Sequence, residues 1–191
     1  MDLLYQLENS IDVNLAINEQ ISILEKFDNI EDKQILELGK LHKYTEAGIL
    51  IEYLGFDRLQ KHQEIFIQLL QDMNWPGAGG AARMFSKAEI KALPIVKRTL
   101  ETVLNDDIWL DWIIIHIVDD WSRELVIELP ILKELVERGI NQGSAVRALR
   151  VLKEKDLVSK EFILEKYKYL SKKFETDKYA LQDLREEIIF D

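Results

Sequence analysis

Two short sequence signatures each occur twice in the chain, at nearly the same spacing. A Leu-x-Asp-x-x-Trp signature runs from Leu70 to Trp75 and again from Leu104 to Trp109, 34 residues further on. A Leu-Pro-Ile-x-Lys signature runs from Leu93 to Lys97 and again from Leu129 to Lys133, 36 residues further on. Internal periods of this length are typical of arrays of helical hairpins. We therefore predict an all-α fold, a short α-α superhelix of helical hairpins of the armadillo/HEAT-like type.

The rest of the chain agrees with a helical fold. Its 191 residues include only 8 glycines and 3 prolines, and most apolar residues recur with the spacing of amphipathic helices. We predict a single all-helical domain over residues 1–191. It comprises N-terminal helices in 1–56, a repeat-like core in 57–139 and C-terminal capping helices in 140–191.

Local signals predict where individual helices begin and end. Acidic and hydroxyl side chains favour a helix start, proline fits the first turn, and glycine favours the residue after the last turn. These signals predict the start of one helix after Asp12, of another near Glu31 and of a third at Pro76. They predict both ends of further helices, which run from Thr45 to Gly55, Asp57 to about Asp72, Ser144 to Lys155, Ser159 to Phe174 and Asp177 to Phe190.

Small residues fill the stretch from Gly77 to Ala82, directly after Pro76. In a helix they let a neighbouring backbone approach closely, which is the interpretation we favour. The alternative is a glycine-rich loop that cradles phosphate. No strand is expected before the stretch and no Gly-Lys-Ser/Thr follows it, so the phosphate loop is the weaker alternative.

Charge and composition narrow the classes of partner. The chain has 35 acidic and 25 basic residues, a net charge of −10, which disfavours nucleic acid and anionic membrane surfaces as partners. It has no cysteine, so disulfides, thiolate catalysis and cysteine-based zinc sites are excluded. The N-terminus lacks a signal-peptide pattern and no apolar run is long enough to span a bilayer. We expect a cytoplasmic protein without a cofactor.

The segment from Asp106 to Trp121 is both the most apolar and one of the most acidic in the chain. Because its apolar side chains point in nearly every direction, we predict that it is the central, buried helix. Its acids and aromatic residues also form a candidate binding face for a basic protein partner. The candidate residues are Asp107, Asp111, Trp112, His116, Asp119, Asp120 and Trp121.

The same residues leave two alternatives open. Asp107 and Asp111 are one helical turn apart, as are His116 and Asp120, and such pairs can grip a divalent cation. No second helix offers a matching pair of ligands, so we predict no metal site. The tryptophans could form a ligand cage, but large aromatic residues at helical spacing more often fill a core, which we favour.

The recurring signature also carries a family resemblance. Its residues are Asp72, Asn74, Trp75, Pro76, Asp106 and Trp109, within the sequences QDMNWPGA and LNDDIWLDW. The segment from about Leu59 to Arg138 resembles the bacterial domain-of-unknown-function family numbered five-zero-seven-one. The resemblance implies an armadillo/HEAT-like fold. Similar small proteins often occur near bacterial secreted toxin systems, where an immunity role is suspected, so the resemblance also implies such a role. It implies no catalytic residue.

We therefore expect a non-enzymatic protein-binding module. The narrower expectation is an immunity-like protein that masks a basic toxin or effector. One alternative is a general scaffold that binds through its Lys- and Tyr-rich C-terminal helices. Another is a small-molecule or metal-dependent enzyme with an acidic site. The sequence leaves the oligomeric state open.

Overall fold

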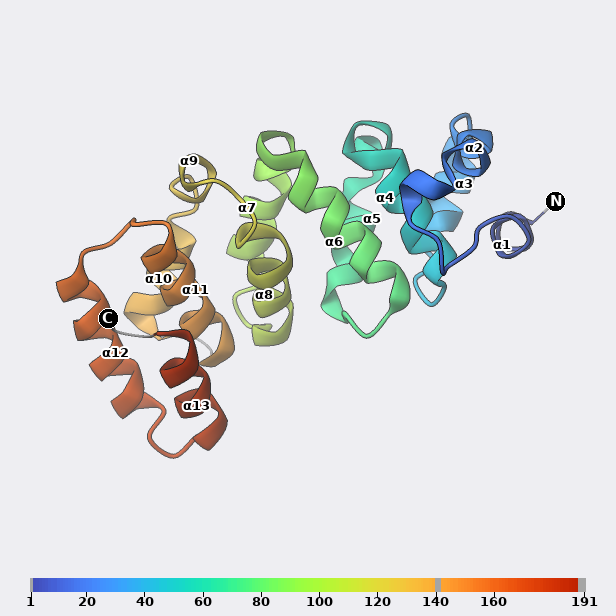
Figure 1. The fold of residues 1–191 in the computed structure, drawn as a ribbon. Helices are drawn as coiled ribbons and strands as arrows, with labels where there is room; N and C mark the ends of the chain where they lie inside the picture. Colours follow the sequence, from blue (N-terminus) through green and yellow to red (C-terminus); the bar gives the residue numbers. More distant parts are fainter. Residues whose placement is uncertain (1, 140–141, 189–191) are drawn as a thin grey trace. The chain divides into compact units, whose positions relative to one another are not determined.

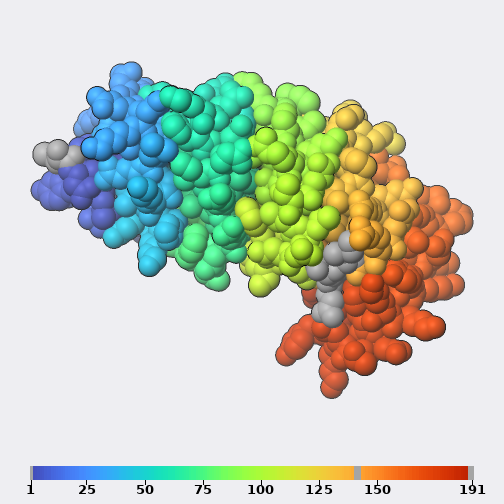
Figure 2. Space-filling model, turned by 180° about the vertical axis from the view of Figure 1, so that it is seen from behind, coloured from blue at the N-terminus to red at the C-terminus, as the bar shows by residue number. Residues whose placement is uncertain are grey.

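The computed structural model describes residues 2–139 and 142–188, and every regular element within them is helical (Figure 1). This confirms the predicted all-α class. Contacts divide the chain into two compact units, Met1–Ile95 and Val96–Asp191, whereas we interpreted the sequence as one domain in three parts. The two units can be followed by colour on the molecular surface in Figure 2. The armadillo/HEAT-like superhelix stays a prediction, and each unit is described by itself.

The N-terminal unit consists of short α-helices linked by 3₁₀ turns, which are labelled η. In chain order they are α1 (Leu3–Glu8), η1 (Ile17–Glu19), α2 (Ile21–Leu24), η2 (Glu25–Phe27), α3 (Asp32–Leu38), α4 (Thr45–Leu59), η3 (Gln60–His62), α5 (Gln63–Ile67), η4 (Gln68–Gln71), α6 (Pro76–Ala88) and η5 (Glu89–Lys91).

The C-terminal unit follows a boundary that falls within α7 (Leu93–Thr102). Its remaining elements are α8 (Asp107–Ile113), a π-helical turn η6 (Ile114–Val118), α9 (Arg123–Val126), α10 (Ile131–Arg138), α11 (Gln142–Glu154), α12 (Lys160–Lys173) and α13 (Lys178–Glu187).

Several predicted helix ends are confirmed. Glu31 is the residue before α3, and Pro76 is the first residue of α6. The Ser159 hydroxyl accepts a hydrogen bond from the Phe162 amide, and the Asp177 carboxylate accepts from two amides of α13. Each signal acts within its own helical turn, so it is readable from a few residues. The predicted end of the last helix at Phe190 lies outside the described residues.

The segment from Asp57 to Gln71 is helical, but it does not form the single helix predicted from Asp57 to about Asp72. Instead, α4 resumes after a break at Gly55 and continues to Leu59, and residues 60–71 alternate between 3₁₀ and α geometry. Gly55 has φ 70° and ψ 173°, a conformation open to glycine and strained for other residues. The predicted end at Gly55 is therefore confirmed as a break in the helix, and α4 includes the short helical segment beyond this kink.

α4 and α6 cross with their backbones almost in contact. A Cβ built on Gly80 would lie 1.9 Å from the Gly48 carbonyl oxygen, and one on Gly48 would lie 3.1 Å from the Gly77 Cα. The Gly77 amide also donates a hydrogen bond to the His42 carbonyl at 2.9 Å. The close-packing interpretation of the small residues is confirmed. The phosphate-loop alternative is wrong, because the stretch is helical.

α11 is the central helix of the C-terminal unit. It packs against α8, η6, α10, α12 and α13. The prediction that Asp106–Trp121 is the central helix is therefore wrong in its choice of element. α8 and η6 do bury apolar side chains, but α11 lies between them and the C-terminal helices. The buried side chains of these elements include Leu110, Ile113, Ile114, Ile117, Val118, Val146, Leu149 and Val151.

Candidate functional site

The two acids at the start of α8, Asp106 of the signature and Asp107 of the predicted binding face, make contacts within their own unit. The Asp106 carboxylate caps α8 by accepting a hydrogen bond from the Trp109 amide at 3.0 Å. The Asp107 carboxylate accepts from the amides of Gly143 and Ser144, at 3.1 and 2.9 Å, and from the Ser144 hydroxyl at 2.7 Å. Asp107 thereby holds the first turn of α11.

Asp111 and Asp119 belong to a partly buried ion-pair cluster that joins α8, α11 and α13. Arg147 of α11 lies 3.6 Å from the Asp111 carboxylate, and Arg150 lies 2.9 Å from that of Asp119. Glu187 of α13 pairs with both arginines, at 3.1 Å from the Arg150 Nε. We call these five residues the Arg147 cluster. Its carboxylates face arginines rather than an outside partner.

The titration of Asp111 is perturbed by its surroundings in the Arg147 cluster. Burial raises the pKa of Asp111 to about 6. The nearby Arg147 and Arg150 lower this pKa, whereas Asp107 and Asp183 raise it further. Desolvation therefore outweighs the attraction of the arginines, and Asp111 ionises at a higher pH than an ordinary aspartate.

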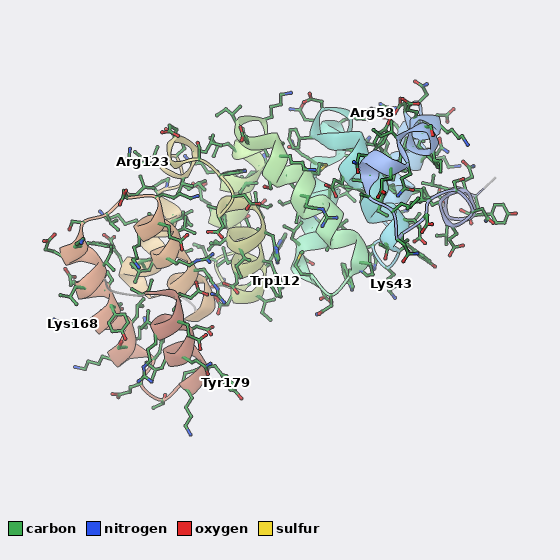
Figure 3. The ribbon with its side chains drawn as sticks, viewed as in Figure 1. Lys43, Arg58, Trp112, Arg123, Lys168 and Tyr179 are labelled. Carbon is green, nitrogen blue, oxygen red and sulfur yellow. The ribbon has the colours of Figure 1, made fainter. Side chains whose placement is uncertain are left out.

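The aromatic residues of the predicted face divide between core and surface. Trp121 is only 1% exposed and fills the core. Trp112 is partly exposed on α8 (Figure 3) and its ring lies 5.5 Å from that of His116. Burial lowers the pKa of His116, although Asp120 opposes the shift. Trp112, His116 and the exposed Asp120 are therefore what the predicted face presents at its surface.

The signature residues occupy different helix positions in the two copies. Asp72 accepts hydrogen bonds from the Asn74 amide and side chain, at 3.0 and 2.8 Å, and forms the turn before α6. Trp75 is the residue before α6, and its ring lies 4.0 Å from that of His42. Trp109, by contrast, lies inside α8. The two copies of the signature thus both lie at the start of a helix, but Trp75 precedes its helix whereas Trp109 lies inside it.

Neither a metal-binding group of side chains nor a membrane-spanning helix is found in the described part of the chain. Among residues 2–139 and 142–188, no group of three or more His, Asp or Glu side chains is arranged to hold a metal ion. In the same residues, no helix is both long enough and apolar enough to cross a membrane.

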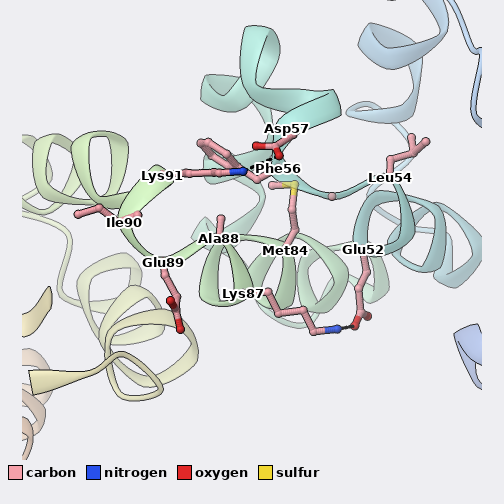
Figure 4. A pocket seen from close by; sticks show the side chains of 11 residues that line it. Glu52, Leu54, Phe56, Asp57, Met84, Lys87, Ala88, Glu89, Ile90 and Lys91 are labelled. Atoms are coloured by element: carbon pink, nitrogen blue, oxygen red, sulfur yellow. Dashed lines mark hydrogen bonds and ion pairs between the residues drawn. The ribbon is translucent and has the colours of Figure 1, made fainter.

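The sequence interpretation missed a groove on the N-terminal unit, beside the kink in α4 (Figure 4). It consists of two clefts that share Glu52 and Lys87. The first, of about 480 Å³, is lined by Gly55, Phe56, Met84, Ala88 and Ile90, among others. The second, of about 650 Å³, is lined by Val13, Leu15 and Ile49, among others. We call the two together the Glu52 groove.

Ion pairs cross the Glu52 groove. The Glu52 carboxylate is 8% exposed and accepts from Arg83 Nε at 2.5 Å and from Lys87 Nζ at 2.6 Å. Lys91 pairs with Asp57 at 2.5 Å. Burial would raise the pKa of Glu52, but the hydrogen bonds from Lys87 and Arg83 hold it below its ordinary value. Glu52 therefore stays ionised and fixes two cations along the groove.

Two unusual backbone conformations line the first cleft. Gly55 has φ 70°, and Glu89 has φ 48°, which is rare for a residue with a side chain. Such strain often gathers at binding sites.

One signal for the Glu52 groove was present in the sequence: Arg83, Lys87 and Lys91 are spaced by four residues, the spacing of one helix face. Their anionic partners lie 31 to 35 residues earlier, so the ion pairs require the contact of α4 with α6.

No family model, curated protein or solved structure matches the chain. The resemblance to the bacterial family of unknown function therefore stays a prediction.

Proposed function

We propose that this protein is a non-catalytic protein-binding module and that it binds a segment of its partner in the Glu52 groove. The observation that carries the proposal is an apolar floor crossed by ion pairs that Glu52 holds in place. Clefts of several hundred Å³ can bury large side chains. A central apolar anchor within a charged rim is the usual anatomy of a protein-binding site.

The absence of enzymatic activity is part of this proposal. Asp107, Asp111 and Asp119 are the acids that an acidic active site would use, and each is held by α11. A metal-dependent enzyme would instead gain thermal stability with divalent cations. A rise in the unfolding temperature with millimolar Mg²⁺, Mn²⁺ or Zn²⁺ would favour that alternative.

The narrower hypothesis, immunity-like masking of a basic toxin or effector, keeps the net charge of −10 as its support. Its proposed contact face loses Asp107, Asp111 and Asp119 to contacts inside the unit. The general-scaffold alternative is supported by α12 and α13, whose exposed side chains include Lys168 and Tyr179 (Figure 3). The surface of α13 has clefts of about 540 and 420 Å³, which are lined mainly by polar and charged residues. The first cleft of the Glu52 groove is instead lined by Phe56, Met84 and Ile90, and this apolar lining favours the groove.

Selection of peptides from a displayed random library against the whole chain tests the proposal. Ala88→Trp fills the first cleft, and Ile90→Asp places a charge at its rim. Thr176→Trp introduces a tryptophan beside Tyr179, at an exposed position on the surface of the general-scaffold alternative, and is the control. We expect the selected peptides to bind both groove variants at least tenfold more weakly and the control unchanged. Failure to select any peptide, or unchanged binding to both folded groove variants, would overturn the proposal.

A further inference from the structure

We infer that the segment bound in the Glu52 groove carries a bulky apolar side chain next to a carboxylate. This inference rests on the proposed function and adds the chemistry of the partner. The apolar side chain occupies the first cleft, and the carboxylate binds Arg83 and Lys87 where the two clefts meet.

The first cleft has the floor that an apolar side chain requires. Phe56 and Met84 are buried beneath it, Ala88 is partly exposed, and Ile90 is exposed at the rim. A Cβ built on Gly55 would meet no atom within 4 Å, so open space lies directly over the kink. An apolar side chain that enters this space removes the floor and the Ile90 rim from water together.

The boundary between the clefts has an excess of positive charge. Two cations, Arg83 and Lys87, share the single carboxylate of Glu52. They are 56% and 67% exposed, whereas Glu52 is 8% exposed, so the cations face an incoming ligand. A guanidinium has five N–H donors and an ammonium three, and their bonds to Glu52 use one nitrogen of each side chain. A ligand carboxylate can therefore bind both cations without displacing Glu52.

The remaining charges restrict where that carboxylate can bind. Lys91 is paired with Asp57, which leaves no excess charge at that pair. Glu89 also lines the first cleft and lies at the opposite end from Glu52 in Figure 4. Its negative charge disfavours a ligand carboxylate there. The geometry thus orients the ligand, with its acid toward Arg83 and Lys87 and its apolar side chain toward Ile90.

A carboxylate beside an apolar side chain can come from an internal Asp or Glu or from the C-terminus of a chain. The test uses each selected peptide in three synthetic forms. One is unchanged, one has its acidic residues replaced by the matching amides, and one has an amidated C-terminus. Dissociation constants are measured against the wild type, Lys87→Met and Lys43→Met. Lys43 is an exposed lysine of the same unit outside the groove and is the matched control.

We expect one of the neutralised forms to bind the wild type and Lys43→Met at least tenfold more weakly. The form that weakens identifies the source of the carboxylate. Against Lys87→Met the same neutralisation should have a much smaller effect, because the two charges act on each other. If Ala88→Trp abolishes binding but neutral and charged forms bind the wild type equally, the inference fails and the proposed function stands. If Ala88→Trp and Ile90→Asp leave binding unchanged, the proposed function itself fails.

Discussion

The carboxylate of Asp107 accepts two hydrogen bonds from Ser144, one from its amide at 2.9 Å and one from its hydroxyl at 2.7 Å. Asp107 is in the first turn of α8, and Ser144 is in the first turn of α11. One carboxylate therefore lies at the N-termini of two helices, where the amide dipoles of both favour a negative charge. Asp107, which we predicted to contact a partner, instead connects α8 to α11 within the unit.

Removal of the Asp107 carboxylate should destabilise the C-terminal unit. Because two amides and a hydroxyl lose their acceptor, we expect Asp107→Ala to lower the free energy of unfolding by about 1–3 kcal/mol. Urea denaturation followed by circular dichroism measures the change. Glu101→Gln, at an exposed acid of the same unit, is the control and should stay within about 0.5 kcal/mol of the wild type. Equal effects of the two substitutions would contradict the structural role of Asp107.

The Arg147 cluster should make stability depend on pH in an unusual direction. Because burial raises the pKa of Asp111 to about 6 from an ordinary 3.8, the folded state holds the Asp111 proton more tightly than the unfolded state between these values. The contribution of Asp111 to stability is therefore greatest below pH 4 and is lost as the pH rises through about 6.

Asp111→Asn isolates this contribution. Between pH 4 and 7 the wild type should lose on the order of 2–3 kcal/mol relative to the variant, since each unit of pKa corresponds to about 1.4 kcal/mol. Unfolding free energies of both proteins at several pH values give the difference directly. A difference that is constant with pH, or that grows in favour of the wild type, would refute the raised pKa.

Helix ends were predictable where their chemistry is local. Ser159 and Asp177 bind amides two or three residues further along, so a short stretch of sequence contains the whole interaction. The division of residues 60–71 into short turns and the central place of α11 depend on tertiary packing instead. The acidic partners of Arg147 and Arg150 lie on other parts of the chain, so the sequence of α11 alone does not identify them.

The candidate residues were identified as unusual, but their roles were not predictable. Asp107 and Gly143, and the Asp119 carbonyl and Lys155, are each 36 residues apart, so α8 with η6 runs parallel to α11 at a constant offset. In the N-terminal unit, Glu52 with Lys87 and Asp57 with Lys91 are 35 and 34 residues apart along α4 and α6. These offsets match the repeat in the sequence. A period in the sequence does not identify which acid contacts which base.

Glu52 should stabilise the N-terminal unit at neutral pH. Because its pKa is held below the ordinary value of 4.5, its contribution is present above that value and is lost as the pH falls through the lowered pKa. We expect Glu52→Gln to reduce the free energy of unfolding at pH 7 by about 1–3 kcal/mol, since Arg83 and Lys87 lose their shared partner. At a pH below the lowered pKa the two proteins should converge. A deficit of the same size at low pH would assign the effect to packing instead of charge.

The crossing of α4 and α6 should tolerate a methyl group at one glycine of α6 and not at its neighbour. A Cβ on Gly80 would lie 1.9 Å from the Gly48 carbonyl oxygen, so the two backbones would have to separate. A Cβ on Gly79 would meet only the end of the Arg83 side chain, at 3.2 Å, which can move. We expect Gly80→Ala to cost about 3 kcal/mol or more, as overpacking against rigid backbone does. Gly79→Ala should be neutral or stabilise by up to about 1 kcal/mol, because alanine is the better helix former. Thermal and urea unfolding of the two variants compare the same chemical change at adjacent positions, and a Gly80→Ala protein as stable as Gly79→Ala would disprove the close crossing.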